Sequence, residues 1–313
     1  MWLRGGGAVT GWGACRLHGA NFFDGLLPDG RTRMPVPVCV GPLGQLRTKP
    51  GITVSHERLG AGEVVIRHGI ACTLERRALF DAMRTAPDVR EAVVAMEMMA
   101  AAELVSIQQM KEYVDAHPGW KGVAQVRGAL ELASEDSRSP NETRMRLIWL
   151  LDTGLPRPEV NQEVFDLHGR LIGVADLLDV EVGVVGEFDG ADHRGALRHT
   201  KDVAREEWFR RVGLEYFKVT GLDLPMRSRV AARMHSTRAR ARRLSQSGGQ
   251  SGGQSGSQSG SQSGSSGGRR WTIDPPPGWE TPAMSLHERL EHRAWQISLL
   301  EQFERENPSL GAS

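Results

Sequence analysis

Short apolar runs and then helix-spaced apolar positions characterise the first 133 residues. Runs bounded by glycine and proline predict strands at 36–40, 52–56 and 63–66. From Leu74 to Ala102 the apolar residues recur with a helical period, which predicts helix across that stretch. Ser106 is a typical N-cap for a helix reaching about residue 116, and another helix is predicted near 123–133. We therefore expect residues 1–133 to form a small α+β domain.

The apolar pattern changes rhythm in residues 139–244, where a helix is followed by a series of strands. It predicts a helix over 140–151, strands over 159–165, 171–178 and 182–188, a helix over 202–212 and a strand over 214–219. A basic helix is predicted from about Met226. Helix, strands, helix and strand in this order predict an α/β domain in which helices cover a sheet.

The C-terminal part divides into a linker and a tail. Residues 245–268 consist almost entirely of Gly, Ser and Gln, which cannot build a core, so a flexible tether is predicted. The tail, 269–313, begins with a proline-rich turn and continues into a predicted amphipathic helix over 284–304. The apolar face of that helix predicts a packing surface, either against the body of this chain or against a partner protein.

Composition sets broad limits on the chain. It has 313 residues, enough for two modest domains, and its 39 basic and 38 acidic residues nearly cancel. The three cysteines are far apart and form no CxxC pair, which argues against a disulfide framework or a thiolate zinc site and favours a cytoplasmic location. No apolar run approaches the roughly 18 residues that span a bilayer, and the N-terminus lacks a signal-peptide pattern.

Candidate chemistry lies in residues 173–193. Asp176 interrupts an apolar strand, and a carboxylate there is costly unless it is hydrogen-bonded, paired or bound to a cation. Glu187 and Asp189 alternate along the next strand and should project from one face. Carboxylates from adjacent strands can hold Mg²⁺ or Mn²⁺ together with water and phosphate oxygens. His193 follows closely and is the candidate general base, because histidine titrates near neutrality.

The order of these residues resembles the Vsr-like endonucleases, a branch of the PD-(D/E)XK nuclease superfamily, over about residues 139–224. The resemblance implies a restriction-endonuclease-like mixed sheet flanked by helices, preceded here by the small α+β domain. The matching positions are Glu142, Asp176, Glu187-Phe-Asp189-Gly190, His193, Asp202-x-x-Arg205 and Gly213-Leu-Glu-Tyr-Phe-Lys-Val.

The resemblance also implies roles for these residues. Asp176 and Glu187 would bind the metal, Glu142 would point into the site from its helix, and Asp202 and Arg205 would support it. The superfamily's lysine, two residues after the second acid, is replaced here by Asp189. The compensating cation is left open among three residues: Lys201, Arg205 and Lys218.

Each candidate has an alternative, purely structural interpretation. Glu142 completes a capping-box pattern with Ser139, which would place its side chain at the start of its own helix. Asp189-Gly190 is also typical of a hairpin turn. His193 lies among charged neighbours as surface histidines do, and Asp202 with Arg205 could be a surface ion pair.

Two further segments bear on DNA. Residues 10–19 and the predicted helix near 73–99 loosely resemble the N-terminal part of abortive-infection-type antitoxin regulators, which implies a winged helix that is truncated here. The segment 226–244 carries seven arginines and no acidic residue, which favours phosphate binding over a merely solubilising helix end. The predicted DNA contacts are Arg227, Arg229, Arg233, Arg238 and Arg240.

Three functions follow as hypotheses. The first is a Mg²⁺- or Mn²⁺-dependent DNA endonuclease, used in repair or phage defence. The second is a non-catalytic, antitoxin-like regulator that keeps the nuclease fold and binds DNA. The third is a scaffold whose C-terminal helix recruits a partner protein.

Overall fold

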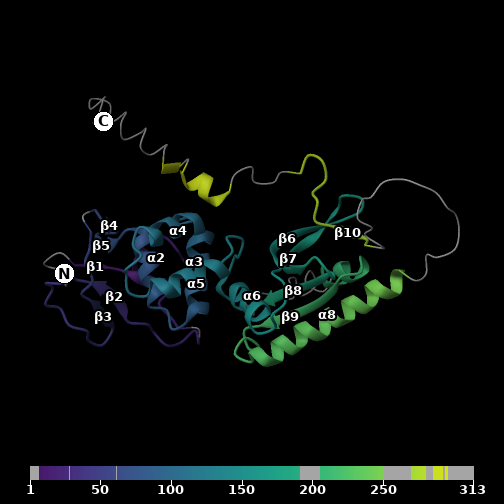
Figure 1. Cartoon of the computed structure of the whole chain (residues 1–313), viewed down its shortest axis with the longest axis horizontal. Coiled ribbons are helices and arrows are strands. Elements are labelled where there is room, and N and C mark those ends of the chain that lie inside the picture. The colour runs from purple at the N-terminus through teal and green to yellow at the C-terminus, as the bar shows by residue number, and fades with distance from the viewer. Residues whose placement is uncertain are drawn as a thin grey trace. The chain divides into compact units, whose positions relative to one another are not determined.

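The chain is mixed α/β, with two five-stranded mixed sheets flanked by helices (Figure 1). The computed structural model describes residues 7–27, 29–60, 62–190, 205–249, 269–279, 285–291 and 293–294. It divides into two compact units. Unit 1 contains the described residues up to Pro140 together with 285–294, and unit 2 contains those from Asn141 to 279.

The sheet of unit 1 has the strand order β3-β2-β1-β5-β4. Its strands are β1 (Ala8–Val9), β2 (Val36–Cys39), β3 (Ile52–Ser55), β4 (Val64–Arg67) and β5 (Ile70–Thr73). Strands β1 and β5 were not expected from the sequence: β1 has only two residues, and β5 directly precedes the helical segment. A tight turn joins β4 to β5 through His68 and Gly69, both with positive φ.

The helices of unit 1 are α1 (Gly11–Leu17), α2 (Glu75–Arg84), α3 (Val89–Ala101), α4 (Ile107–Asp115) and α5 (Val123–Leu132). The helical stretch predicted from Leu74 to Ala102 is two helices rather than one. Pro87 cannot donate a helical hydrogen bond, and Asp88 caps α3 by accepting from the Glu91 amide. Ser106 and Gln109 form the capping box that starts α4.

The sheet of unit 2 has the order β10-β6-β7-β8-β9. Its strands are β6 (Glu159–Asp166), β7 (Leu171–Asp179), β8 (Val184–Asp189), β9 (Glu215–Thr220) and β10 (Trp271–Thr272). All neighbouring pairs are antiparallel except β8 and β9, which are parallel. A parallel pair needs a crossover, and residues 205–211, which lie between these strands in the sequence, are helical.

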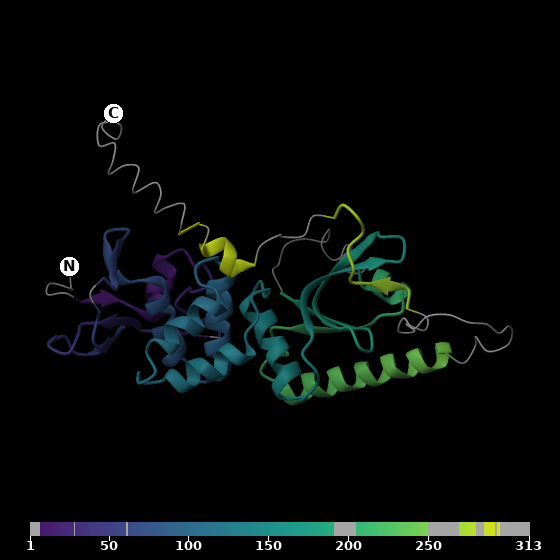
Figure 2. The same cartoon turned by 45° about the horizontal axis from the view of Figure 1, so that its top comes forward.

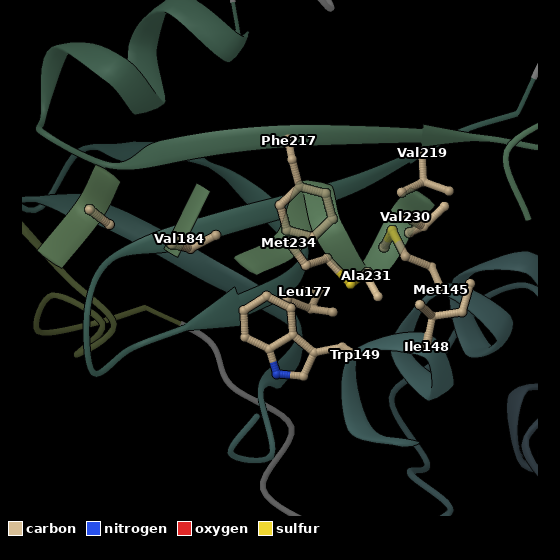
Figure 3. Close-up of a cluster of buried hydrophobic side chains, with 11 residues drawn as sticks. Met145, Ile148, Trp149, Leu177, Val184, Phe217, Val219, Val230, Ala231 and Met234 are labelled. Atoms are coloured by element: carbon tan, nitrogen blue, oxygen red, sulfur yellow. The ribbon is translucent and has the colours of Figure 1, made fainter. Parts of the chain in front are cut away.

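Helices cover both faces of this second sheet. Helices α6 (Pro140–Leu151) and α8 (Arg227–Gly249) pack on one face, with α8 running along the sheet (Figure 2). Trp149, Phe217 and Met234 are central to that core (Figure 3). On the other face, Phe209 of the 205–211 helix packs with strand residues and with Trp271 of β10. The unit is therefore a helix–sheet–helix sandwich.

Residues near the C-terminus pack in both units. Helix α8 continues to Gly249, which is further than the predicted start of the linker at 245. Trp271 of β10 is buried in the core of unit 2. In unit 1, Leu286 and Leu290 are buried, and Arg289 and Arg293 form ion pairs with Glu103. The described part of the predicted amphipathic helix thus packs on its own chain.

Candidate metal centre

Asp176 lies at the point in β7 where the alternation of side chains between the two faces of the sheet is broken. Residues two apart in a regular strand share a face. Ala175, however, packs in the cluster around Phe209, whereas Leu177 packs in the opposite cluster. The side chains of β7 therefore switch from one face of the sheet to the other at Asp176. On the neighbouring strand β6, Asn161 lies between the residues that pair with Leu177 and Ala175, and it has a φ of +48°.

The Asp176 carboxylate is held against strand β8, next to Glu187. Its Oδ2 accepts a hydrogen bond of 2.8 Å from the amide N of Phe188, the residue directly after Glu187. The side chain of Glu187 is buried, and this burial raises its pKa to about 7. The guanidinium of Arg205 opposes the shift, while the charge of Asp176 adds to it. The two acids predicted as a metal pair therefore lie side by side.

Only one of the two carboxylate oxygens of Glu187 is satisfied. Oε2 accepts from Nη2 of Arg205 and, at 3.1 Å, from the hydroxyl of Tyr216 on β9. Oε1 is buried and has no hydrogen-bond partner among the described residues. Leaving a buried acceptor unmatched costs free energy that a bound cation would recover. The donor set, two neighbouring carboxylates in a partly enclosed position, suits Mg²⁺ or Mn²⁺.

Glu142 reaches the sheet from helix α6. Its Oε2 accepts a 3.0 Å hydrogen bond from Nδ2 of Asn161. Asn161 lies between the β6 residues that pair with Leu177 and Ala175, the two neighbours of Asp176, so this contact places Glu142 near the part of the sheet that carries Asp176. The capping-box interpretation of Glu142 stays a prediction alongside this contact.

Asp189 forms an ion pair with a lysine of the neighbouring strand. Its Oδ2 is 3.4 Å from Nζ of Lys218 on β9. Lys218 is also the register partner of Glu187 and helps to oppose the rise of its pKa. Of the three candidate cations, Arg205 contacts the buried acid directly and Lys218 lies on the adjacent strand. Asp189 is the last residue of β8.

Three predicted residues, Lys201, His193 and Asp202, lie outside the described residues. Within the described part of the chain, no group of three or more His, Cys, Asp or Glu side chains forms a metal-binding cluster. The described centre is thus a carboxylate pair. Such a pair is sufficient for Mg²⁺, which keeps several waters and takes substrate oxygens as further ligands.

The arginines predicted to contact DNA have different environments. Arg238 is 5% exposed and pairs with Asp179 at 2.7 Å, so its guanidinium is used inside unit 2. The arginines at 233 and 240 also have acidic partners, Asp223 and Glu215 respectively. Arg227 is exposed and 4.0 Å from Asp152, and Arg229 is exposed with no ion pair among the described residues. The last two are the best placed for an external phosphate.

The sequence assigned no role to two residues of this centre. Tyr216 lies in the matched segment that begins at Gly213, but only the β8–β9 register brings its hydroxyl to Glu187. Asn161 carried one usable signal, because Asn is the residue that most readily adopts a left-handed backbone after Gly and is disfavoured in strands.

Comparisons with protein-family models, curated proteins and solved structures found no match to this chain. No helix in the described part of the chain is long and apolar enough to cross a bilayer. The function must therefore be inferred from the site itself.

Proposed function

We propose that unit 2 is a metal-dependent endonuclease that hydrolyses phosphodiester bonds in DNA. The observation that carries the proposal is the buried, unmatched Oε1 of Glu187 beside the carboxylate of Asp176. Mg²⁺ or Mn²⁺ bound by these two residues would stabilise negative charge on the phosphate and acidify an attacking water.

The order of elements supports the proposal. Helix α6, the antiparallel strands β6, β7 and β8, the helical residues 205–211 and the parallel strand β9 follow one another in unit 2. We take this mixed sheet with helices on both faces as support for the restriction-endonuclease-like fold that the resemblance to Vsr-like nucleases implies. The acids lie on the two central strands of the α6–β9 core, where such an enzyme would place its metal.

The neighbouring side chains have distinct tasks in this proposal. Arg205 and Tyr216 both hold Oε2 of Glu187, which fixes the carboxylate and leaves Oε1 for the metal. Lys218 is the cation best placed to neutralise a bound phosphate in the absence of the motif lysine. His193 remains the proposed base that accepts the proton of the attacking water.

Metal binding and cleavage are measured on the same preparations. Electron paramagnetic resonance should detect one bound Mn²⁺ per wild-type chain, and supercoiled DNA should be nicked when Mn²⁺ or Mg²⁺ is added. Glu187→Gln and Asp176→Asn should lose both. Glu181→Gln, on the exposed turn between β7 and β8, is the matched control and should retain both. A wild type that binds no Mn²⁺, with or without DNA, would rule the proposal out.

The second candidate function is a DNA-binding regulator that does not cut. One contact favours it: Arg205 forms an ion pair with Glu187, so part of the charge of this acid is offset without a cation. If the protein is such a regulator, the Arg205→Gln variant should bind DNA as tightly as the wild type. Neither the wild type nor the variant should then nick DNA in the presence of any metal. In a nuclease, Arg205→Gln should instead misplace Glu187 and lower the cleavage rate with little change in DNA affinity.

A further inference from the structure

Unit 1 contains a small pocket between the segment before β4, helix α2 and the α4–α5 connection. Its volume is about 170 Å³. It is lined by Glu57, Arg58, Gly60, Glu63, Arg77, Phe80, Arg84, His117, Trp120 and Lys121. Sites for drug-sized ligands usually measure roughly 300–1,000 Å³. This pocket therefore has room for a fragment about the size of one ring.

A buried carboxylate anchors two arginines beside the pocket. Asp81 is 2% exposed, and its two oxygens accept from Nε of Arg77 at 3.0 Å and Nε of Arg84 at 2.6 Å. Thr10 also donates to Asp81, at 2.6 Å. Asp81 thus holds both guanidiniums through their Nε atoms and uses none of their Nη donors.

The outer nitrogens of these arginines have donors to spare. Nη1 of Arg77 bonds Glu63 and the carbonyl of Arg58, but no described residue accepts from Nη2. Arg84 has only a 3.7 Å ion pair to Glu57 beyond its Nε bond. The side chains are 3% and 9% exposed, yet neither arginine has an unmatched nitrogen sealed from water. Both arginines line the pocket, and their outer nitrogens keep donors for a ligand.

Aromatic rings form another part of the wall. Trp120 meets Phe80 edge-on, with ring centroids 5.2 Å apart, and His117 lies 4.0 Å away. The guanidinium of Arg77 lies 4.5 Å from the centroid of the Trp120 ring. A flat ring entering the pocket would meet aromatic edges and a delocalised cation, both of which attract π-systems.

The charges select the ligand's anionic group. Four cationic side chains, Arg58, Arg77, Arg84 and Lys121, face three carboxylates, Glu57, Glu63 and Asp81. One positive charge is left over, which suits a singly charged carboxylate and disfavours a phosphate dianion beside Glu57 and Glu63. We propose that this pocket binds a small aromatic carboxylate, with its ring beside Trp120 and its carboxylate on the outer nitrogens of Arg84 and Arg77.

Binding is tested on the full chain with benzoate as the probe, followed by calorimetry and ligand-observed NMR. A fragment of this size should bind with a Kd on the order of 1 mM. Acetate lacks the ring, benzyl alcohol lacks the charge, and inorganic phosphate carries more charge; each should bind about tenfold more weakly or worse. If acetate or phosphate binds as well as benzoate, the pocket is only a general anion site and the proposal is wrong.

Variants locate the binding. Lys121 is exposed and pairs with no described residue, so Lys121→Gln should fold normally and weaken benzoate binding about threefold. Lys111→Gln, on α4 but not lining the pocket, is the matched control and should bind as wild type does. Arg84→Lys keeps the charge but loses the planar fork, and should cost about tenfold in affinity. Equal affinity in the wild type and both pocket variants would overturn the proposal.

Discussion

Unit 1 and unit 2 each bury a carboxylate against arginine, but they complete its hydrogen bonds differently. Asp81 in unit 1 has both oxygens matched, by Arg77, Arg84 and Thr10. Glu187 in unit 2 has one oxygen matched by two donors and one oxygen matched by none. A fully matched buried acid fixes local structure, whereas a half-matched one retains the capacity to bind a ligand. The contrast separates a structural acid from a candidate functional one.

The largest expected effect is at the matched acid. Asp81→Asn would leave two buried guanidiniums without their shared counter-charge, and we expect the free energy of unfolding of unit 1 to fall by about 3–5 kcal/mol. Denaturant unfolding followed by tryptophan fluorescence measures this. Asp115→Asn, at an exposed ion pair with Arg127, is the control and should change stability by less than about 1 kcal/mol. A small effect at Asp81 would remove the distinction between the two acids.

The next effect is the pH dependence of unit 2 without metal. Glu187 has a pKa of about 7 when folded and an ordinary value of 4.5, so the folded state holds its proton more tightly. The contribution of Glu187 to the free energy of unfolding is therefore most favourable below pH 4.5. It falls by about 2–3 kcal/mol as the pH rises to 7. Stability curves at a series of pH values test this. Saturating Mg²⁺ or the variant Glu187→Gln should abolish the loss, and a profile that Mg²⁺ leaves unchanged would contradict metal binding at this acid.

A smaller effect on the free energy of unfolding is expected at Asn161, which lies beside the site of Asp176 and Glu187. Asn161→Ala forces alanine into a left-handed backbone and removes the donor to Glu142, and should cost about 1–2 kcal/mol. Asn161→Gly accepts the backbone and should recover part of this stability, but not the contact with Glu142. Equal stability of the two variants would show that the positive φ of Asn161 carries no strain.

The smallest effect is expected at Tyr216. Its hydroxyl donates to the ionised Glu187, so Tyr216→Phe should raise the pKa of Glu187 further and cost about 1 kcal/mol above neutral pH. Carbon-detected NMR of the glutamate carboxyls follows the titration directly. An unchanged pKa in the Phe variant would mean that Arg205 alone holds Oε2.

Local sequence patterns predicted unit 2 better than unit 1. The helix at 140–151 and the strands that carry Asp176 and Glu187 were predicted close to their observed bounds, and the alternation of Glu187 and Asp189 is visible in the sequence. Strand β1 has only two residues and pairs with strands far away in the chain, and β5 runs directly into the helical segment that follows it. Periodicity reports local structure and carries little information about remote partners.

The same limitation applies to charged residues. The arginines of α8 look alike in the sequence, but Arg238 is buried because Asp179 lies opposite it on β7. Likewise, the hydroxyl of Tyr216 reaches Glu187 only through the parallel register of β8 and β9. A single sequence identifies the acids of the candidate site but not the donors that tune them.

The late position of Trp271, Leu286 and Leu290 in the chain has a consequence for synthesis on the ribosome. Trp271 completes the core of unit 2, and the two leucines are buried in unit 1. Domains generally fold as they emerge during translation. Here neither unit can reach its final packing until Trp271, Leu286 and Leu290 have left the exit tunnel, so nascent chains stalled within 250–268 should expose apolar surface and depend on chaperones.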